Sequence, residues 1–353
     1  MGDDVLDRDP RIKLSIGAKQ EGRADGQFNN PRGLAFDPRG LLLVADSGNH
    51  RVQVFSQGDD EGFSFVSKFG EQGNGAGQFQ YPSGVSIDQD HDRILVIDGG
   101  SLHIQSWSLS DQSFLSCIGQ QASTVLELGS PQGIAVDKHH HRIVVASSKN
   151  NRLDFLSSID LSFLFSVGNR GFLPGKFDHP PAVAIDDDRH RIIVSDTFNH
   201  RVQVLSSIDG SFLLEFGSRG KQRGQFCNPH GVCVDNHGRI IVADSHNFRL
   251  QAFTHEGHLI SSVHCGREMP CAVAFDKHRG LIAFTAGHRV HVIGANQWLA
   301  DTMYTWCPDR HRYAPSWIKQ AVSTMTMIRS VVDESSAMSM IPNELLFEIF
   351  SFL

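Results

Sequence analysis

Three short segments of the chain repeat a set of side chains that could do acid–base or metal chemistry. Each starts with aspartate and passes through asparagine to arginine and an aliphatic residue: 46–52 (DSGNHRV), 196–202 (DTFNHRV) and 244–250 (DSHNFRL). A single active site would occur once, whereas these residue types recur at a fixed spacing. We therefore interpret them as scaffold, in which each arginine offers its planar guanidinium to a carbonyl group or to the aspartate of its own turn.

The sequence offers little else on which a reaction could be built. It has 19 histidines but no G-x-S-x-G, P-loop or H-E-x-x-H motif. Its six cysteines include no C-x-x-C pair, so they are expected to be buried apolar residues rather than zinc ligands. We predict no catalytic residue, no cofactor and no metal, and hence a protein that is not an enzyme.

Composition limits the class of protein further. The 353 residues are 40% hydrophobic and carry a formal net charge of -7, which argues against a protein that coats nucleic acid with its whole surface. No stretch approaches the roughly 18 continuous apolar residues of a membrane-spanning helix. The first residues, MGDDVLDRDPRIK, contain no apolar signal region. We expect reduced thiols, a cytoplasmic or nuclear location and no membrane partner.

A long internal repeat positions the aspartate-to-arginine segments. Each copy opens like GQFNNPRGLAFD, from Gly26, and continues like LLLVADSGNHRVQVF. The six opening prolines recur at a nearly constant period, which marks a repeat array; they are Pro31, Pro82, Pro131, Pro180, Pro229 and Pro270.

Each copy predicts four short antiparallel strands, because its apolar runs are β-branched, bounded by turn residues and in part alternating. Four strands in such a period make one blade of a β-propeller. We therefore predict an all-β fold, a six-bladed propeller over residues 11–294 with a short helical C-terminal extension. The last copy has three strands, so a strand over residues 11–17 is expected to complete the sixth blade and close the ring.

The repeated openers and the DSxNHRV segments resemble the NHL repeat, over roughly residues 11–294. By pattern the chain is similar to the propellers of tripartite-motif ubiquitin ligases, although it lacks their RING and B-box zinc modules. Some NHL-like six-bladed enzymes, such as peptide-amidating lyases, hold a metal in the central channel with several histidines. Here one imidazole occurs among the six residues expected to face that channel: Arg32, Ser83, Gln132, Pro181, His230 and Cys271.

One face of the predicted propeller is the candidate binding surface. Antiparallel strands alternate ends, so the connections between blades and the DSxNHR turns emerge on the same side. The candidate partner-binding residues there are Arg32, Arg170, Lys176, Arg219, Lys221, Arg223, His230, Phe198 and Phe248. The resemblance implies single-stranded or hairpin RNA as one partner, held by phosphate neutralisation and base stacking. The alternatives are a peptide-binding face and a solvated one.

The C-terminal part has a different character. Residues 295–338 predict an irregular and helical linker, with an apolar stripe from Ile318 to Val332. Residues 339–353 contain IPNELLFEIFSFL, which resembles the start of an F-box. That resemblance implies docking on a Skp-type adaptor through Pro342, Leu345, Leu346, Ile349, Phe350 and Leu353. The alternative is an amphipathic helix that packs on the ring or on another copy.

Both ends of the chain thus resemble proteins of ubiquitin-dependent degradation. We predict a non-catalytic interaction scaffold that binds proteins as a substrate receptor associated with ubiquitin ligase machinery. The alternative is an RNA-binding post-transcriptional regulator that uses the basic loop face. A metal-dependent lyase-type propeller ranks third.

Overall fold

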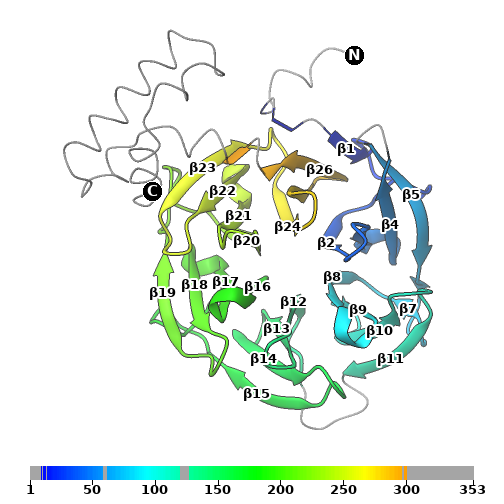
Figure 1. Ribbon diagram of the computed structural model, residues 1–353, viewed down its shortest axis with the longest axis horizontal. Coiled ribbons are helices and arrows are strands. Elements are labelled where there is room, and N and C mark those ends of the chain that lie inside the picture. The colour runs from blue at the N-terminus through cyan, green and yellow to red at the C-terminus, as the bar shows by residue number, and fades with distance from the viewer. Residues whose placement is uncertain are drawn as a thin grey trace, which may run out of the picture. The chain divides into compact units, whose positions relative to one another are not determined.

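The computed structural model describes residues 9, 11–12, 14–58, 62–119, 127–295 and 298–299. The chain divides into two compact units, Met1–Ala295 and Asn296–Leu353. In the first unit, six four-stranded antiparallel sheets surround a common centre (Figure 1). This arrangement confirms the predicted all-β, six-bladed propeller.

The strands of each blade are named a to d from the centre outward. Blade 1 contains β2 (Pro31–Phe36), β3 (Leu42–Asp46), β4 (Arg51–Gln57) and β5 (Phe63–Phe69). Blade 2 contains β8 (Pro82–Asp88), β9 (Arg93–Asp98), β10 (His103–Ser108) and β11 (Phe114–Gly119). Blade 3 contains β12 (Pro131–Asp137), β13 (Arg142–Ser147), β14 (Arg152–Ser157) and β15 (Phe163–Val167).

The second half of the ring repeats this order. Blade 4 contains β16 (Val183–Asp186), β17 (Arg191–Asp196), β18 (Arg201–Ser206) and β19 (Phe212–Phe216). Blade 5 contains β20 (Pro229–Val234), β21 (Ile240–Asp244), β22 (Arg249–Phe253) and β23 (Leu259–His264). Blade 6 contains β24 (Pro270–Asp276), β25 (Leu281–Ala286), β26 (Arg289–Gly294) and, as its outer strand, β1 (Leu14–Gly17).

The N-terminal strand closes the ring, as the sequence predicts. β1 pairs with β26 in antiparallel register from Leu14 opposite Val292 to Gly17 opposite Arg289. The strand begins three residues later than expected, because Arg11 belongs to a preceding turn. There the guanidinium of Arg11 donates to the carboxylate of Asp9, and its backbone N–H donates to the same side chain at 3.1 Å. The N-terminal strand and the last repeat thus share one sheet, which removes two exposed sheet edges.

Hydrophobic cores form between neighbouring blades. Each b strand is buried on both faces, as in β3 and β9, where every residue is buried. Between blades 1 and 2, for example, Phe69, Phe79 and Trp107 pack in one cluster, with ring centroids of Phe69 and Trp107 4.6 Å apart. Because these cores are shared, each blade is stabilised by its neighbours and the ring folds as a unit.

The phenylalanine of each GQF-type opener plugs the outer end of the blade interface. Phe226 is fully buried, and the preceding Gly217 has a φ of +91°. A Cβ atom at Gly217 would overlap the ring of Phe226. The same pairing joins Gly168 to Phe177. The repeat therefore needs glycine here both for the left-handed backbone and for the space.

The remaining elements are short. Five 3-10 turns of three residues precede the third or second strand of their blades: η1 (Ser47–Asn49), η2 (Gln89–His91), η3 (Asp187–Arg189), η4 (Thr197–Asn199) and η5 (Ser245–Asn247). β6 (Glu71–Gln72) and β7 (Gln78–Phe79) form a two-stranded parallel pair. Among the described residues, no helix is long and apolar enough to cross a membrane. The predicted linker and the F-box-like segment with Pro342, Leu345, Leu346, Ile349, Phe350 and Leu353 lie outside the described residues, apart from 295 and 298–299.

Candidate functional site

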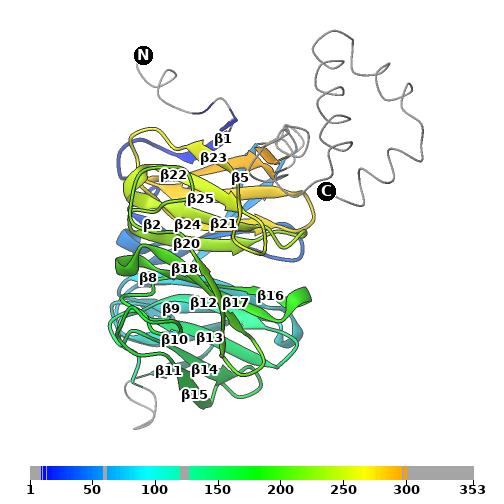
Figure 2. The ribbon, with the colours of Figure 1, turned by 90° about the vertical axis from the view of Figure 1, so that its left-hand side faces the viewer.

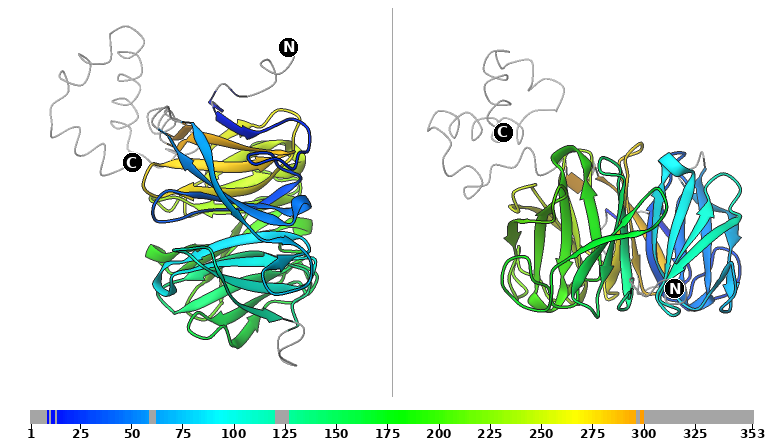
Figure 3. Two further views of the ribbon diagram at one scale, coloured as in Figure 1. Left: turned by 90° about the vertical axis from the view of Figure 1, so that its right-hand side faces the viewer. Right: turned by 90° about the horizontal axis from the view of Figure 1, so that it is seen from below.

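The candidate site lies on the face of the ring that carries the connections between blades and the b-to-c turns, named here the loop face. The strands run between this face and the opposite one (Figures 2 and 3). In blade 4, Asn199 of the b-to-c turn donates from Nδ2 to the carbonyl of Gly171 in the incoming connection, at 2.8 Å. The two kinds of loop therefore meet on one side, as predicted from strand alternation.

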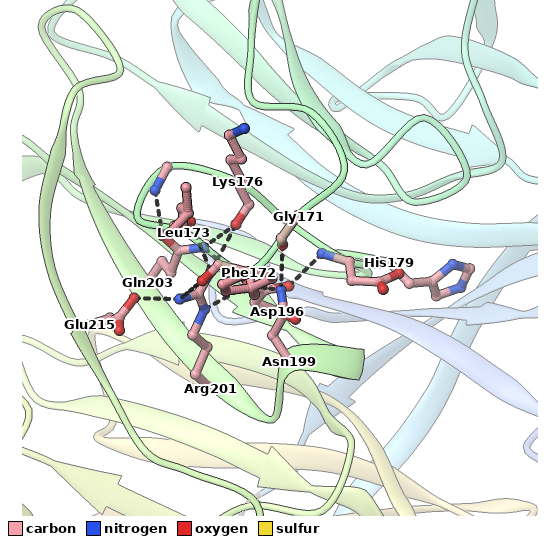
Figure 4. Close-up of polar contacts among 12 residues, drawn as sticks. Gly171, Phe172, Leu173, Lys176, His179, Asp196, Asn199, Arg201, Gln203 and Glu215 are labelled. Atoms are coloured by element: carbon pink, nitrogen blue, oxygen red, sulfur yellow. Dashed lines mark hydrogen bonds and ion pairs between the residues drawn. The ribbon is translucent and has the colours of Figure 1, made fainter.

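A buried carboxylate organises the loop face of blade 4 (Figure 4). The side chain of Asp196 is inaccessible to solvent and accepts from the Nε of Arg201 at 2.8 Å. It also accepts from the backbone N–H of Asp178 at 2.7 Å and from the Nδ2 of Asn199 at 2.9 Å. Burial raises the pKa of the Asp196 carboxyl, and these donors offset part of that cost. They also join the turn to the loop.

The same arginine clamps the backbone of the incoming connection, residues 168–182. The guanidinium of Arg201 donates to the carbonyls of Phe172 at 2.8 Å, Leu173 at 3.2 Å and Lys176 at 2.9 Å. Its NH1 also contacts the carboxylate of Glu215 at 2.6 Å. The predicted scaffold role of the repeated arginines is therefore confirmed, since Arg201 binds both its own aspartate and carbonyl groups.

Blades 1 and 5 repeat this arrangement. Arg51 contacts Asp46 at 2.8 Å, and Arg249 contacts Asp244 at 2.7 Å. Sequence reasoning missed a further member, the glutamine seven residues after each aspartate. In blade 4 Gln203 donates to the carboxylate of Asp196 at 3.0 Å and to the carbonyl of Lys176 at 2.6 Å. The glutamine recurs in the letters R-V-Q of blades 1 and 4. The alternation of apolar and polar residues alone places it on a solvated face.

In the segments 46–52 and 196–202, the histidine that precedes the arginine connects one blade to the next. The ring of His50 contacts the carbonyl of Gln80, and the backbone N–H of Asn228 donates to the Nδ1 of His200 at 3.1 Å. In both positions histidine adopts a left-handed backbone, with φ of 57° at His50 and 55° at His200. These bonds give the repeated histidines a structural role within the ring.

Three large apolar side chains of blade 4 are exposed on the loop face, and we name them the apolar rim. Phe172 is 75% exposed, Leu173 52% and Phe198 53%. Their segments are joined, because Asn199, next to Phe198, donates to the carbonyl of Gly171, next to Phe172. Phe198 also stacks on the ring of His179, with centroids 4.9 Å apart. The sequence predicted Phe198 here but not Phe172 or Leu173, which lie in a loop without periodicity.

The predicted cations differ in how freely they are presented. Arg219, Lys221 and Arg223 are exposed, and no ion pair engages them within the part of the chain that the structure describes. Arg170 is exposed as well but lies 3.7 Å from the carboxylate of Asp178. Lys176 is half-buried. The blade 5 connection, residues 217–228, therefore carries the least neutralised positive charge.

Two predicted contact residues lie deeper than the loop surface. Arg32 and His230 line a cavity of about 250 Å³ in the centre of the ring, together with Cys271. Phe248 is half-buried and lines an adjoining cavity of about 480 Å³ that shares these three residues. Both occupy the position after an opening proline, which the sequence expects to face the channel, and their assignment as partner-binding residues stays a prediction. Among the described residues, no group of three or more histidine, cysteine or acidic side chains is placed to hold a metal ion.

The electrostatics of this channel mouth are unusual. Burial raises the pKa of the Cys271 thiol, but His230 and Arg32 outweigh it and lower the pKa to about 7. The Sγ of Cys271 lies 3.6 Å from the Nδ1 of His230 and 3.7 Å from an Nη of Arg32. Burial and the charge of His230 together lower the pKa of His179. Sequence reasoning treated Cys271 as a buried apolar residue and missed this cluster.

Comparison with known families identifies the repeat. The NHL repeat matches residues 28–55 and 226–253, which run from the phenylalanine of the opener into the third strand of blade 1 and to the end of the third strand of blade 5. Curated relatives include "Protein brain tumor" of Drosophila melanogaster, 37% identical over 82 residues, and "RING finger protein nhl-1" of Caenorhabditis elegans, 39% identical over 79 residues. The human "E3 ubiquitin-protein ligase NHLRC1" is 34% identical over 88 residues.

These matches are partial on both sides. They span 22 to 25% of this chain and between 8 and 21% of the length of the relatives. Solved structures share the architecture at low identity. A gluconolactonase from Xanthomonas campestris has a TM-score of 0.59 at 16% identity, covering 76% of this chain and 87% of its own. A Bacteroides thetaiotaomicron protein has a TM-score of 0.57 at 17% identity, covering 79% and 73%. The chain thus contains NHL repeats, folds them into a six-bladed β-propeller, and is homologous to NHL-repeat proteins that include ubiquitin ligases.

Proposed function

We propose that the chain is a non-catalytic interaction scaffold that binds a protein partner through the loop face of blade 4. The observation that carries this proposal is the apolar rim. Three large side chains are more than half exposed on a backbone that Arg201 and Asn199 hold in place. Exposed aromatic side chains beside arginine are typical anchors of protein interfaces.

The rigidity of the rim favours recognition of a partner. Arg201 donates to the carbonyls of both Phe172 and Leu173, so the loop is already ordered before a partner binds. A preordered loop loses little conformational entropy on binding. Burying one such side chain contributes about 1.5–3 kcal/mol. Arg170 and Lys176 flank the rim in the same connection, which favours a partner with acidic residues around an apolar anchor.

We further propose that this partner is a substrate for ubiquitination. Support comes from relatives whose names describe a RING finger protein and an E3 ubiquitin-protein ligase. The adaptor would bind the C-terminal segment that resembles an F-box. Replacing Leu345→Asp together with Ile349→Asp should abolish capture of a Skp-type adaptor and leave the propeller and its client intact.

The experiment compares the tagged full chain with residues 1–338, with and without RNase, by quantitative mass spectrometry. If the chain is a ligase receptor, adaptor and cullin peptides should be captured by the full chain and not by residues 1–338, while both should capture the same client proteins. Those clients should carry more ubiquitin when the full chain is present. Loss of no ligase component on truncation would contradict the ubiquitin part of the proposal. Capture of the same client proteins by both chains after RNase treatment would support the scaffold part of the proposal.

The second candidate is RNA binding by the blade 5 connection, favoured by the exposed charges of Arg219, Lys221 and Arg223. Replacing Arg219→Glu and Arg223→Glu should then weaken RNA binding without affecting protein capture. The logarithm of the association constant should fall with that of salt concentration by roughly 0.7 per phosphate neutralised. Binding that does not depend on salt would exclude phosphate contacts.

A further inference from the structure

The centre of the ring contains a cluster that the scaffold role does not use. Cys271 is the second residue of β24, His230 is the second residue of β20, and Arg32 is the second residue of β2. These positions are equivalent in blades 6, 5 and 1, so the fold brings the three side chains together at one point of the channel. They line the central cavity and the adjoining one.

The contacts around the sulfur are those that stabilise a thiolate. The Sγ of Cys271 lies 3.7 Å from a guanidinium nitrogen of Arg32 and 3.6 Å from the Nδ1 of His230. Arginine is charged at every physiological pH, so one cation always faces the sulfur. Thiolates stabilised by neighbouring cations in partly exposed sites are the reactive cysteines of proteins.

Among the described residues that line the two cavities, Glu268 is the one acidic group. Glu268 lines the adjoining cavity, but it is engaged with Arg289 at 2.6 Å and with His291 at 3.5 Å. Tyr81 also lines the central cavity, and its hydroxyl accepts from Asn30. The Nε of Arg32 is buried without a hydrogen-bond partner.

We propose that Cys271 is a modification site, a nucleophilic thiolate at the mouth of the central channel that small peroxides oxidise to sulfenic acid. The thiolate sulfur attacks one peroxide oxygen, an S–O bond forms and the O–O bond breaks. Sulfur is oxidised by two electrons and the peroxide is reduced. The second oxygen leaves as hydroxide, which takes a proton from water, and Arg32 stabilises its developing charge.

The size and setting of the site favour a small oxidant. Cys271 is half-buried, and the cavity it lines holds about 250 Å³. Cys117 offers a matched comparison on the same chain. Cys117 is more exposed than Cys271, but burial and the charge of Asp98 raise its pKa. Exposure alone would make Cys117 the more reactive thiol, whereas thiolate content would make Cys271 the more reactive.

The magnitude of the difference follows from the two ionisation states. A pKa of about 7 rather than the usual 9.0 gives Cys271 about fifty times more thiolate at pH 7. The lower basicity reduces intrinsic nucleophilicity by roughly six- to ten-fold. Cys271 should therefore react about five- to eight-fold faster than a thiol of ordinary pKa with equal access.

The test treats the reduced full chain with hydrogen peroxide at pH 7 in the presence of dimedone and measures labelling of each cysteine by peptide mass spectrometry. Cys271 should be labelled at least several-fold faster than Cys117, and Arg32→Gln should reduce its rate several-fold. Lys149→Gln, which removes an exposed cation beside the b-to-c turn of blade 3, should leave the rate unchanged. Labelling of Cys117 at an equal or greater rate, or no labelling of Cys271, would overturn the proposal.

A second measurement uses the unmodified protein, so it does not depend on how a variant folds. The rate of iodoacetamide alkylation at Cys271 is followed from pH 5 to 10. The proposal requires a midpoint near pH 7 in the unmodified protein. A midpoint at or above pH 9, or alkylation that occurs only when the ring is unfolded, would show that the channel holds no reactive thiolate.

Discussion

Asp196 and Arg201 form an ion pair between a carboxylate with no solvent exposure and a guanidinium that spans three backbone carbonyls of a neighbouring loop. The pair thus links strand β17 to the connection that precedes its own blade. Its consequence is an ordered loop on a surface where loops are usually variable. The exposed side chains of that loop are therefore held at fixed positions.

The first prediction concerns this pair. Arg201→Leu leaves the buried charge of Asp196 without its main partner, and breaking such a pair costs about 3–5 kcal/mol. The free energy of unfolding, from urea titration followed by circular dichroism, should fall by that amount. The matched control is Arg223→Leu, because Arg223 is exposed, and its effect should stay within about 0.5 kcal/mol. Equal effects of the two substitutions would contradict the clamp.

The second prediction separates two reasons for glycine in the repeat. Gly217 and Gly224 both have positive φ, at +91° and +82°, but only a Cβ at Gly217 would meet the ring of Phe226. Both alanine substitutions should cost about 1–2 kcal/mol for the left-handed backbone. Gly217→Ala should cost about 1–3 kcal/mol more for overpacking. Thermal unfolding of the two variants measures the difference, and identical melting temperatures would rule out the plug.

The third prediction concerns ring closure. Deletion of residues 1–18 removes β1, and with it Ile16, which packs in a core cluster with Val290 and Val292. Because the cores are shared between blades, the whole ring should lose stability in one cooperative transition. Ile16→Asp should act in the same direction without removing backbone bonds. A truncated protein with an unchanged melting temperature would show that the ring does not need this strand.

The fourth prediction concerns pH. Burial raises the pKa of the Glu268 carboxyl, but His291 and Arg289 outweigh it and lower the pKa to about 2 from the usual 4.5. Between these values the unfolded chain binds more protons than the folded one, so stability rises with pH. The contribution of Glu268 is present above pH 4.5 and is lost as the pH falls toward 2.

Urea unfolding of the wild-type protein and of Glu268→Gln across pH 3 to 7 measures that contribution. The difference in unfolding free energy between the two should be greatest at pH 6–7 and should shrink toward pH 3. A difference that stays constant over this range would mean that the carboxylate is not stabilised by its two partners.

The fold was predictable from the sequence because its causes are repeated. The opening prolines, the GQF phenylalanines and the aspartate-to-arginine segments each recur at equivalent points of the repeat. Comparison of the copies therefore reveals a pattern that one copy alone would not. The role of Arg51, Arg201 and Arg249 followed from the same recurrence. The closing strand followed from counting strands in the last copy.

The candidate site was less predictable, because it depends on how the copies differ. Phe172 and Leu173 are exposed in a connection whose carbonyls Arg201 binds, and no periodic pattern marks them in the sequence. Cys271 and His230 are 41 residues apart and meet through ring geometry rather than through a motif. A second ring of contacts on the opposite face was also missed.

In that second ring, arginines at the start of b strands donate to carbonyls of the following blade. Arg191 donates to the carbonyl of His255 at 2.8 Å, and Arg279, which precedes its b strand, reaches the carbonyl of Gly40 across the closing interface at 2.8 Å. The letters before each b strand do not reveal such contacts, since the partner is an unspecific backbone group. A sequence pattern identifies the donor in such a bond but not the acceptor.

The central claim is that the apolar rim of blade 4 recruits a protein partner. Its most direct test is quantitative capture, after RNase treatment, by the tagged full chain and by the variant Phe172→Ser with Leu173→Ser and Phe198→Ser. A control variant carries Leu115→Ser with Leu164→Ser, which replaces exposed leucines on the outer strands β11 and β15. The account predicts that specific partners bind the wild type and the control equally and are lost from the rim variant by at least ten-fold. Equal recovery from all three, with the rim variant folded, would contradict it.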